Sequence, residues 1–216
     1  LGAPRGFFAD RVWPEVTAAV EAALGIFAGL GAEVIEAPWP EAEAARGVGF
    51  VVNRVESAAV HEGMPPERLA LLGADLRPRL VAGRLIPAPY YLRALRARQV
   101  VKHSVARLFR EHRLDALLAP TLPATAALAE RPMIFHYDDG VEEPLGTGYT
   151  RLTMPFNATG QPVLAVPCGF DRLGLPIGLQ IAGRPFAEAT ICRIGAAYEA
   201  ATEWHTRRPA FASEGR

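Results

Sequence analysis

Apolar residues form two long uninterrupted runs late in the chain, and this pattern predicts a β-hairpin. Residues 163–170 and 176–182 are apolar at successive positions, and residues 171–174 between them have the composition of a turn. Because apolar and polar residues do not alternate, both faces of these strands are expected to be buried, as in central strands covered by helices on each side. Pro167 cannot donate a ladder hydrogen bond, so a bulge or an unpaired side is predicted there.

Helical spacing of apolar residues dominates the rest of the chain. Four segments have this spacing, and they cover residues 13–29, 41–61, 90–113 and 187–204. Shorter helices are expected at residues 149–156 and at residues 69–85, where Pro78 interrupts the helix. Short strands are expected at residues 33–37 and 114–119. This mixture of helices and buried strands predicts the α/β class.

Residues 124–148 have no periodicity and contain several proline and glycine residues. A loop of this length in a compact domain is more often functional than idle. Two interpretations remain open. The loop covers a substrate cleft, with Phe135, His136 and Tyr137 as its contact residues, or it is a surface excursion.

The balanced charge argues against some classes of partner. The 216 residues include 23 basic and 23 acidic residues, so the formal net charge is zero. Nucleic acid and anionic membrane surfaces would favour a basic surplus, so neither is the expected partner. A basic stripe runs along residues 93–110, and the charge balance favours a solvated face over a phosphate or tRNA contact there. No apolar run or leader pattern points to a membrane, so a cytoplasmic protein is expected.

No catalytic residue is predicted within these residues. A serine nucleophile needs a nearby base, a tight glycine-rich turn and backbone N–H groups that stabilise the oxyanion. Ser57, Ser104 and Ser213 have no such glycines beside them. Ser57 and His61 have helical spacing that permits a hydrogen bond, but a serine in the middle of a helix has no free N–H groups beside it.

Metal and cofactor binding are not expected either. The histidines show no metal-binding spacing, and Asp138-Asp139 is interpreted as a turn rather than a metal site. His112 falls on the apolar side of its helix and is interpreted as a core histidine. Cys168 and Cys192 lie in apolar segments and are interpreted as small core residues.

Residues 153–185 resemble the C-terminal part of the amidase signature family. The resemblance rests on Pro-Phe-Asn at 155–157, Gly-Gln-Pro at 160–162, Val-Pro-Cys-Gly at 166–169 and Gly-Leu-Pro-Ile-Gly-Leu-Gln at 174–180. Further segments that resemble the family follow one another in the same order as in the family, and they are residues 2–5, 30–34, 115–123 and Glu188. The resemblance covers essentially the whole chain. It implies that residues 1–216 are the C-terminal portion of a single α/β domain, with a mixed sheet covered by helices on both faces.

Enzymes of this family use a serine nucleophile, a second serine in a cis peptide and a lysine, all in the N-terminal part of their chains. None of these maps onto this sequence, whose only lysine is Lys102. The resemblance therefore implies a C-terminal portion of an amidase with its chemistry upstream, inactive by itself. A sheet interrupted at Leu1 is expected to leave an uncovered edge and apolar surface.

By the same resemblance, this part of the chain supplies walls of the substrate pocket. The residues expected there lie at strand ends or in the loop before the hairpin, and they are Thr121, Tyr149, Met154, Asn157 and Gln161. The expected partners are a small amide and the N-terminal portion of the same protein, with homodimerisation left open. Two other interpretations stand beside this one. The first is a fragment of the glutamine-hydrolysing subunit of a tRNA-dependent amidotransferase, and the second is a noncatalytic α/β binding or scaffolding module.

Overall fold

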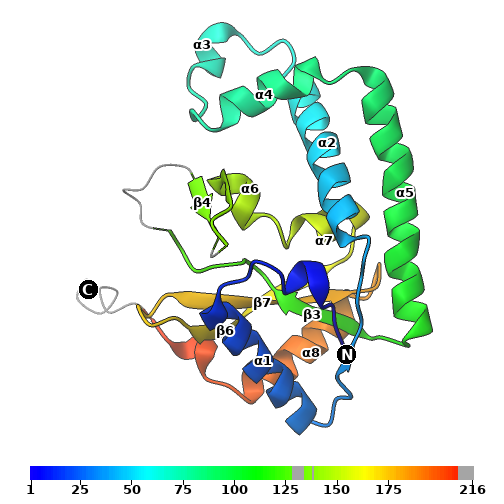
Figure 1. Cartoon of the computed structure of the whole chain (residues 1–216), viewed down its shortest axis with the longest axis vertical. Helices are drawn as coiled ribbons and strands as arrows, with labels where there is room; N and C mark the ends of the chain where they lie inside the picture. The colour runs from blue at the N-terminus through cyan, green and yellow to red at the C-terminus, as the bar shows by residue number, and fades with distance from the viewer. Residues whose placement is uncertain (128–133, 138, 209–216) are drawn as a thin grey trace.

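The chain folds around one mixed β-sheet, as Figure 1 shows. The computed structural model describes residues 1–127, 134–137 and 139–208. The strands of the sheet are β1 (Gly2–Ala3), β2 (Ile35–Glu36), β3 (Ala116–Pro120), β6 (Val163–Phe170) and β7 (Pro176–Gly183). Their order is β2-β1-β3-β7-β6, with β1 parallel to β2 and β3, and with β7 antiparallel to β3 and β6. The predicted α/β class and mixed sheet are confirmed.

Helices cover both faces of the sheet. One core lies between the sheet and the helices α1 (Pro14–Gly29) and α8 (Glu188–Ala200). The second core lies on the opposite face, under α2 (Ala42–Val60), α5 (Ala88–Glu111) and α7 (Met154–Thr159). Successive side chains of a strand point to opposite faces, and Leu118 accordingly belongs to the first core and Leu117 to the second.

The hairpin of β6 and β7 forms as predicted but without the predicted burial. Its pairing shifts between Pro167 and Gly169, which is the bulge expected at the proline. In the turn, the Asp171 carboxylate accepts hydrogen bonds from the backbone N–H groups of Leu173 and Leu175, each at 2.8 Å. β7 is buried along most of its length, but β6 is an edge strand and Val163 is 39% exposed. The prediction of two buried faces is therefore wrong for β6.

The strand at the start of the chain is not an edge of the sheet. β1 lies between β2 and β3 and so has a neighbour on each side. Among the strands that the structure describes, the two edges are β2, which is only two residues long, and the eight-residue β6. The longer open edge therefore belongs to the hairpin.

A helical arm projects from the sheet (Figure 1) and is formed by α2, α3 (Pro66–Leu69), α4 (Leu76–Leu85) and α5. α4 packs closely on α2, because Gly83 has no side chain and a Cβ there would overlap the carbonyl oxygen of Arg54. Pro78 lies in the first turn of α4, where a missing N–H costs nothing, so the helix predicted at residues 69–85 is interrupted at residues 70–75 and not at Pro78. No helix among the described residues is long and apolar enough to cross a membrane.

The described part of residues 124–148 has secondary structure of its own. It contains the two-stranded sheet of β4 (Ile134–His136) and β5 (Glu142–Pro144), followed by α6 (Leu145–Tyr149). Phe135, Tyr137 and Tyr149 pack edge to face in a small core. The helix expected at residues 149–156 is instead divided between α6 and α7. Two 3-10 turns, η1 (Gly6–Phe8) and η2 (Trp204–Thr206), complete the fold.

Candidate substrate-binding site

Two of the five predicted pocket residues meet in one cleft. Met154 and Asn157 are three residues apart on α7 and therefore share a face of that helix. They line a cleft of about 260 Å³ between α2, α5 and α7. The floor of this cleft depends on Gly49 of α2, because a Cβ there would lie 2.7 Å from the sulfur of Met154.

The same cleft contains polar groups that sequence analysis missed. They are Asn53 and Glu56 of α2 and Arg98 of α5. Arg98 donates a hydrogen bond from Nε to the carbonyl oxygen of Ala158 at 2.6 Å, which ties α5 to α7. The carboxylate of Glu56 accepts a hydrogen bond from the Tyr91 hydroxyl at 3.1 Å, and this bond raises the pKa of Tyr91. The cleft thus presents both donors and acceptors, as recognition of a carboxamide group requires.

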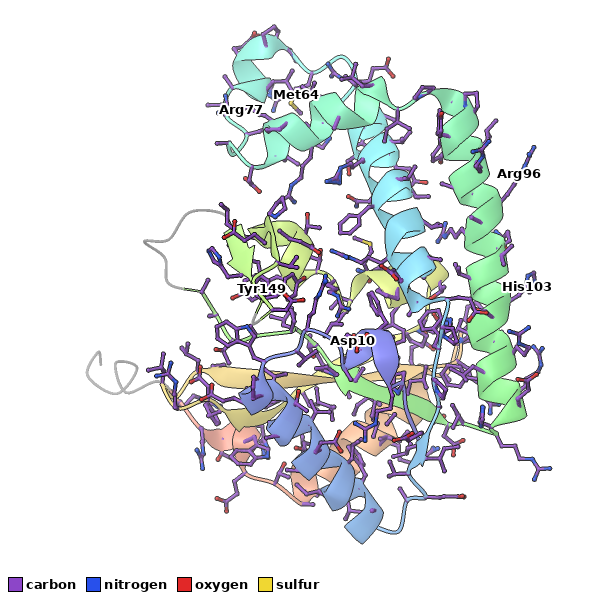
Figure 2. All side chains as sticks on the ribbon, in the orientation of Figure 1. Asp10, Met64, Arg77, Arg96, His103 and Tyr149 are labelled. Carbon is purple, nitrogen blue, oxygen red and sulfur yellow. The ribbon has the colours of Figure 1, made fainter. Side chains whose placement is uncertain are left out.

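A signal for Arg98 was present in the sequence. Arg98 lies four residues after Ala94 and three before Val101, both of which are buried on the inner face of α5. A cation on an otherwise apolar helical stripe indicates either a buried partner or a binding site. Arg96, in contrast, projects away from the fold on the outer face of α5, as Figure 2 shows.

Tyr149 lies in a different cavity. Its hydroxyl donates a hydrogen bond to the carbonyl oxygen of Thr125 at 2.5 Å, and burial raises its pKa. The cavity has a volume of about 390 Å³ and is mostly apolar, with walls that include Trp13, Phe135 and Leu175. Tyr149 and the α7 residues therefore face separate spaces.

The two remaining predicted residues make local contacts. Thr121 follows β3, and its backbone N–H donates to the carbonyl oxygen of Gly178 at 2.8 Å. The Thr121 hydroxyl is buried without a hydrogen-bond partner in the described part of the chain. The side-chain oxygen of Gln161 accepts a hydrogen bond from the Thr159 hydroxyl at the end of α7. Their predicted role in substrate binding stays a prediction.

The serines within the described residues are not arranged as nucleophiles. The ring Nδ1 of His61 lies 2.8 Å from the backbone oxygen of Ser57, so the imidazole contacts the helix backbone. Ser104 is buried, where its hydroxyl accepts a hydrogen bond from Trp39 Nε1 at 2.9 Å and donates to Val101 at 3.0 Å. Lys102 is exposed on α5. Ser213 lies outside the residues that the structure describes.

Two predicted core residues prove to be exposed. Cys168 is buried as expected, and burial raises its pKa to about 12, so its thiol is unreactive. Cys192, in contrast, lies on the outer side of α8, because the apolar stripe of that helix runs through Ile191 and Tyr198. His112 is also exposed, because α5 ends at Glu111 and the chain turns away there.

No group of three or more histidine, cysteine, aspartate or glutamate side chains that could hold a metal ion occurs in the described ranges. Asp138, assigned to a turn from the sequence, lies outside them. Asp139 is described, and its carboxylate accepts a hydrogen bond from the Val141 N–H at 3.0 Å. That bond lowers the pKa of Asp139 and fits the predicted turn.

Comparison with curated proteins places these features in a family. Residues 1–192 match the Amidase family. An amidase of Pseudomonas putida is 42% identical over 99% of this chain and 45% of its own length. A glutamyl-tRNA(Gln) amidotransferase subunit from Chloroflexus aggregans is 32% identical over 98% of this chain and 46% of its own length. The chain thus spans about half the length of the curated relatives it matches.

Solved structures agree with the sequence matches. A crystal structure described as that of an amidase superimposes with a TM-score of 0.83 and 28% identity, covering 93% of this chain and 45% of its own. A second structure is described as a vestigial protein complex that reveals the origins of an s-triazine catabolic enzyme. It superimposes with a TM-score of 0.79 and 32% identity, covering 92% of this chain and 42% of its own. Because the family match extends over residues 1–192 and an amidase is 42% identical over 99% of this chain, the chain belongs to the amidase family.

Proposed function

We propose that these residues are the C-terminal portion of an amidase that hydrolyses the C–N bond of a small carboxamide. The observation that carries this proposal is the 42% identity to an amidase, which extends over 99% of this chain but only 45% of that enzyme. The groups that react with the substrate then belong to the other part of the protein, as a serine, a second serine in a cis peptide and a lysine.

The state of the serines supports this division of labour. An attacking hydroxyl must contact a base and face backbone N–H groups that stabilise the oxyanion. Ser57 lies within α2, where the backbone N–H groups are used in helical hydrogen bonds. The hydroxyl of Ser104 is committed to Trp39 and Val101 in the core. Neither residue meets the requirement.

The cleft between α2, α5 and α7 forms one wall of the substrate pocket in this proposal. Asn157 is exposed at the mouth of the cleft and can exchange hydrogen bonds with an amide or a neighbouring polar group. Glu56 supplies an acceptor and Met154 supplies apolar contact. These residues bind and orient the substrate, and the bond-breaking step takes place on the other part of the protein.

The test compares ammonia release from a panel of carboxamides by the natural polypeptide that contains residues 1–216 and by these residues alone. Hydrolysis by the former and none above background by the latter are expected. In the active polypeptide, Asn157→Ala is expected to raise KM about three- to tenfold with little change in kcat, because it removes uniform binding. Gln99→Ala, an exposed change on α5, is the control.

Other results would assign the protein differently. Turnover by residues 1–216 alone would mean that a nucleophile lies within them. Hydrolysis restricted to glutamine, and dependent on co-purified subunits, would place the protein with the amidotransferase relatives. A natural polypeptide that hydrolyses no carboxamide would support a binding or scaffolding role instead.

A further inference from the structure

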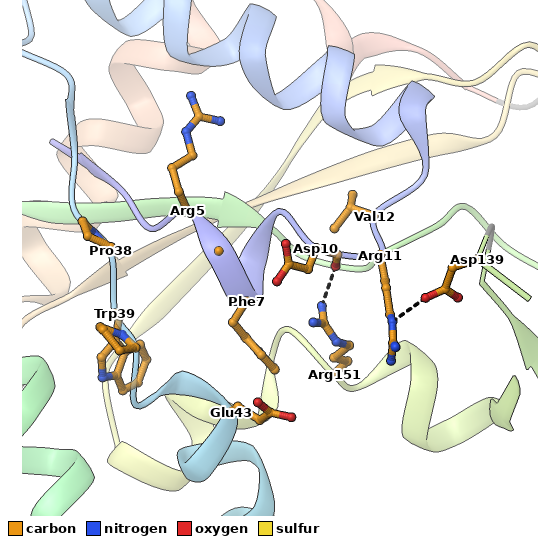
Figure 3. A pocket seen from close by; sticks show the side chains of 12 residues that line it. Arg5, Phe7, Asp10, Arg11, Val12, Pro38, Trp39, Glu43, Asp139 and Arg151 are labelled. Carbon is orange, nitrogen blue, oxygen red and sulfur yellow. Dashed lines mark hydrogen bonds and ion pairs between the residues drawn. The ribbon is translucent and has the colours of Figure 1, made fainter. Parts of the chain in front are cut away.

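A larger cleft lies where two parallel strands end. η1 follows β1, and residues 38–40 follow β2, so both connections leave the sheet at the carboxyl ends of their strands. Ligands of open α/β sheets bind preferentially at such ends. The cleft there has a volume of about 840 Å³ and is drawn in Figure 3. It shares no lining residue with the cleft between α2, α5 and α7.

Arg151 is the unusual residue of this cleft. It lies between α6 and α7, is only 6% exposed, and its guanidinium covers the ring of Phe7 at 4.1 Å. Its Nη1 donates a hydrogen bond to the backbone oxygen of Asp10 at 2.9 Å, as Figure 3 shows. Within the described residues no carboxylate forms an ion pair with it. A buried cation without a counter-ion is costly unless something else supplies the negative charge.

The other arginines of the cleft already have counter-ions. Nε of Arg11 lies 2.8 Å from the Asp139 carboxylate. Arg5 pairs with Glu21 and, at 3.4 Å, with Glu36. These pairs leave Arg151 as the lining arginine that forms no ion pair in the described part of the chain, and the Asp10 carboxylate acts on it only at longer range.

Hydrogen-bond donors near Arg151 also lack acceptors. The hydroxyl of Tyr137 and the Nε of Arg46 are buried and have no partner among the described residues, although Nη2 of Arg46 pairs with the Glu143 carboxylate. Burial lowers the pKa of Arg151, and the charges of Arg46 and Arg11 lower it further, whereas Coulombic interactions with Tyr137 and Asp10 raise it. The N–H groups of Arg151 that have no acceptor among the described residues can therefore donate hydrogen bonds to an oxyanion in the cleft.

Two carboxylates limit the charge that a ligand can carry. Asp10 and Glu43 also line the cleft, are exposed, and form no ion pair in the described ranges. A ligand with one negative charge can approach Arg151 without strong repulsion from them. A dianion would meet about twice the repulsion from each carboxylate, because the Coulomb energy is proportional to the charge of the ligand.

We propose that this cleft binds a small organic acid through a single carboxylate, which accepts hydrogen bonds from the free N–H groups of Arg151. Arginine suits this role because its planar guanidinium can donate two parallel hydrogen bonds to one carboxylate. Phe7 and Pro38 provide apolar contact for the body of the ligand. The inference does not depend on the proposed amidase activity.

The test is isothermal titration calorimetry with benzoate, benzyl alcohol and phthalate on the natural polypeptide that contains residues 1–216. Saturable binding of one benzoate is expected, with at least about tenfold weaker binding of the neutral alcohol and of the dianion. Arg151→Gln should weaken benzoate binding at least about tenfold. Arg96→Gln, which removes an exposed cation from the outer face of α5, should leave it unchanged.

A second variant keeps the proposal testable if Arg151→Gln fails to fold. Asp10→Asn changes an exposed side chain and removes one rim charge, so it should strengthen phthalate binding more than benzoate binding, by roughly two- to threefold. The proposal is overturned if benzoate shows no saturable binding up to about 50 mM. It is also overturned if benzoate and benzyl alcohol bind with equal affinity. The same holds if Asp10→Asn leaves the ratio of the phthalate and benzoate affinities unchanged.

Discussion

The sheet and the helical arm contain similar apolar residues but use them differently. All five residues of β3 are buried, and Leu179 and Ile181 of β7 are fully buried. In the arm, Leu71 is 84% exposed and Leu85 is 76% exposed. Apolar content alone therefore does not distinguish core from surface. The sheet supplies stability, whereas the arm holds Glu56 and Arg98 at a cleft that is open to a ligand.

The largest expected effect on stability comes from a substitution in the sheet. Leu179→Ala removes a fully buried side chain at the centre of β7, so it should lower the free energy of unfolding by about 3 kcal/mol through lost transfer energy and a cavity. Leu71→Ala in the arm should change it by less than about 0.5 kcal/mol. Urea denaturation measures both. Equal losses would show that the arm depends on its apolar surface as the sheet does.

Gln180 tests the polar link between the sheet and the segment before α7. Its side-chain Nε2 donates hydrogen bonds to the carbonyl oxygens of Pro120 at 2.9 Å and Leu152 at 3.0 Å, and the residue is buried. Gln180→Met leaves both carbonyls without this donor and should cost about 2 kcal/mol in the free energy of unfolding. Gln99→Met, at an exposed position of α5, is the matched control. A cost within the error of that control would show that water replaces the lost donor.

Arg98 offers a smaller effect within the arm. Arg98→Met removes the hydrogen bond to Ala158, so it should lower the free energy of unfolding by about 1 kcal/mol and raise KM for the proposed amide substrate. Arg96→Met on the outer face should change neither quantity. A change in stability without a change in KM would assign Arg98 to the fold alone and remove it from the substrate pocket.

The two cysteines allow burial in the sheet to be compared with exposure on a helix, without a substitution that changes stability. Cys168 is buried in β6 with a pKa of about 12, and Cys192 is exposed on α8. At about pH 8 the Cys168 thiol remains protonated, because that pH lies far below its pKa. A thiol reagent should therefore modify one cysteine in the native protein and two after denaturation. Rapid modification of both in the native state would show that β6 opens readily.

The fold was predictable where burial leaves a pattern in the sequence. The spacing of Ala94, Val101 and Val105 identified the inner face of α5, and Pro167 identified the bulge. Burial of β6 was overestimated because an apolar run does not reveal whether a strand has one neighbour or two. His112 was misassigned because helical periodicity does not mark where a helix ends.

The candidate site was predictable only in part. Met154 and Asn157 could be paired, because they are three residues apart on one short helix. Their companions come from α2 and α5, whose approach to α7 depends on tertiary packing around Gly49. The cleft around Arg151 was not found, since it joins residues more than a hundred positions apart in the sequence.

The most direct test of the account is amide hydrolysis by residues 1–216 in isolation. Ammonia release from a carboxamide panel is measured beside the natural polypeptide that contains them, after circular dichroism has shown that both are folded. We predict turnover by the natural polypeptide and none above background by the isolated residues. Turnover by the isolated residues, lost on Ser57→Ala, would contradict the claim that this chain forms a pocket wall and that the reacting groups lie elsewhere.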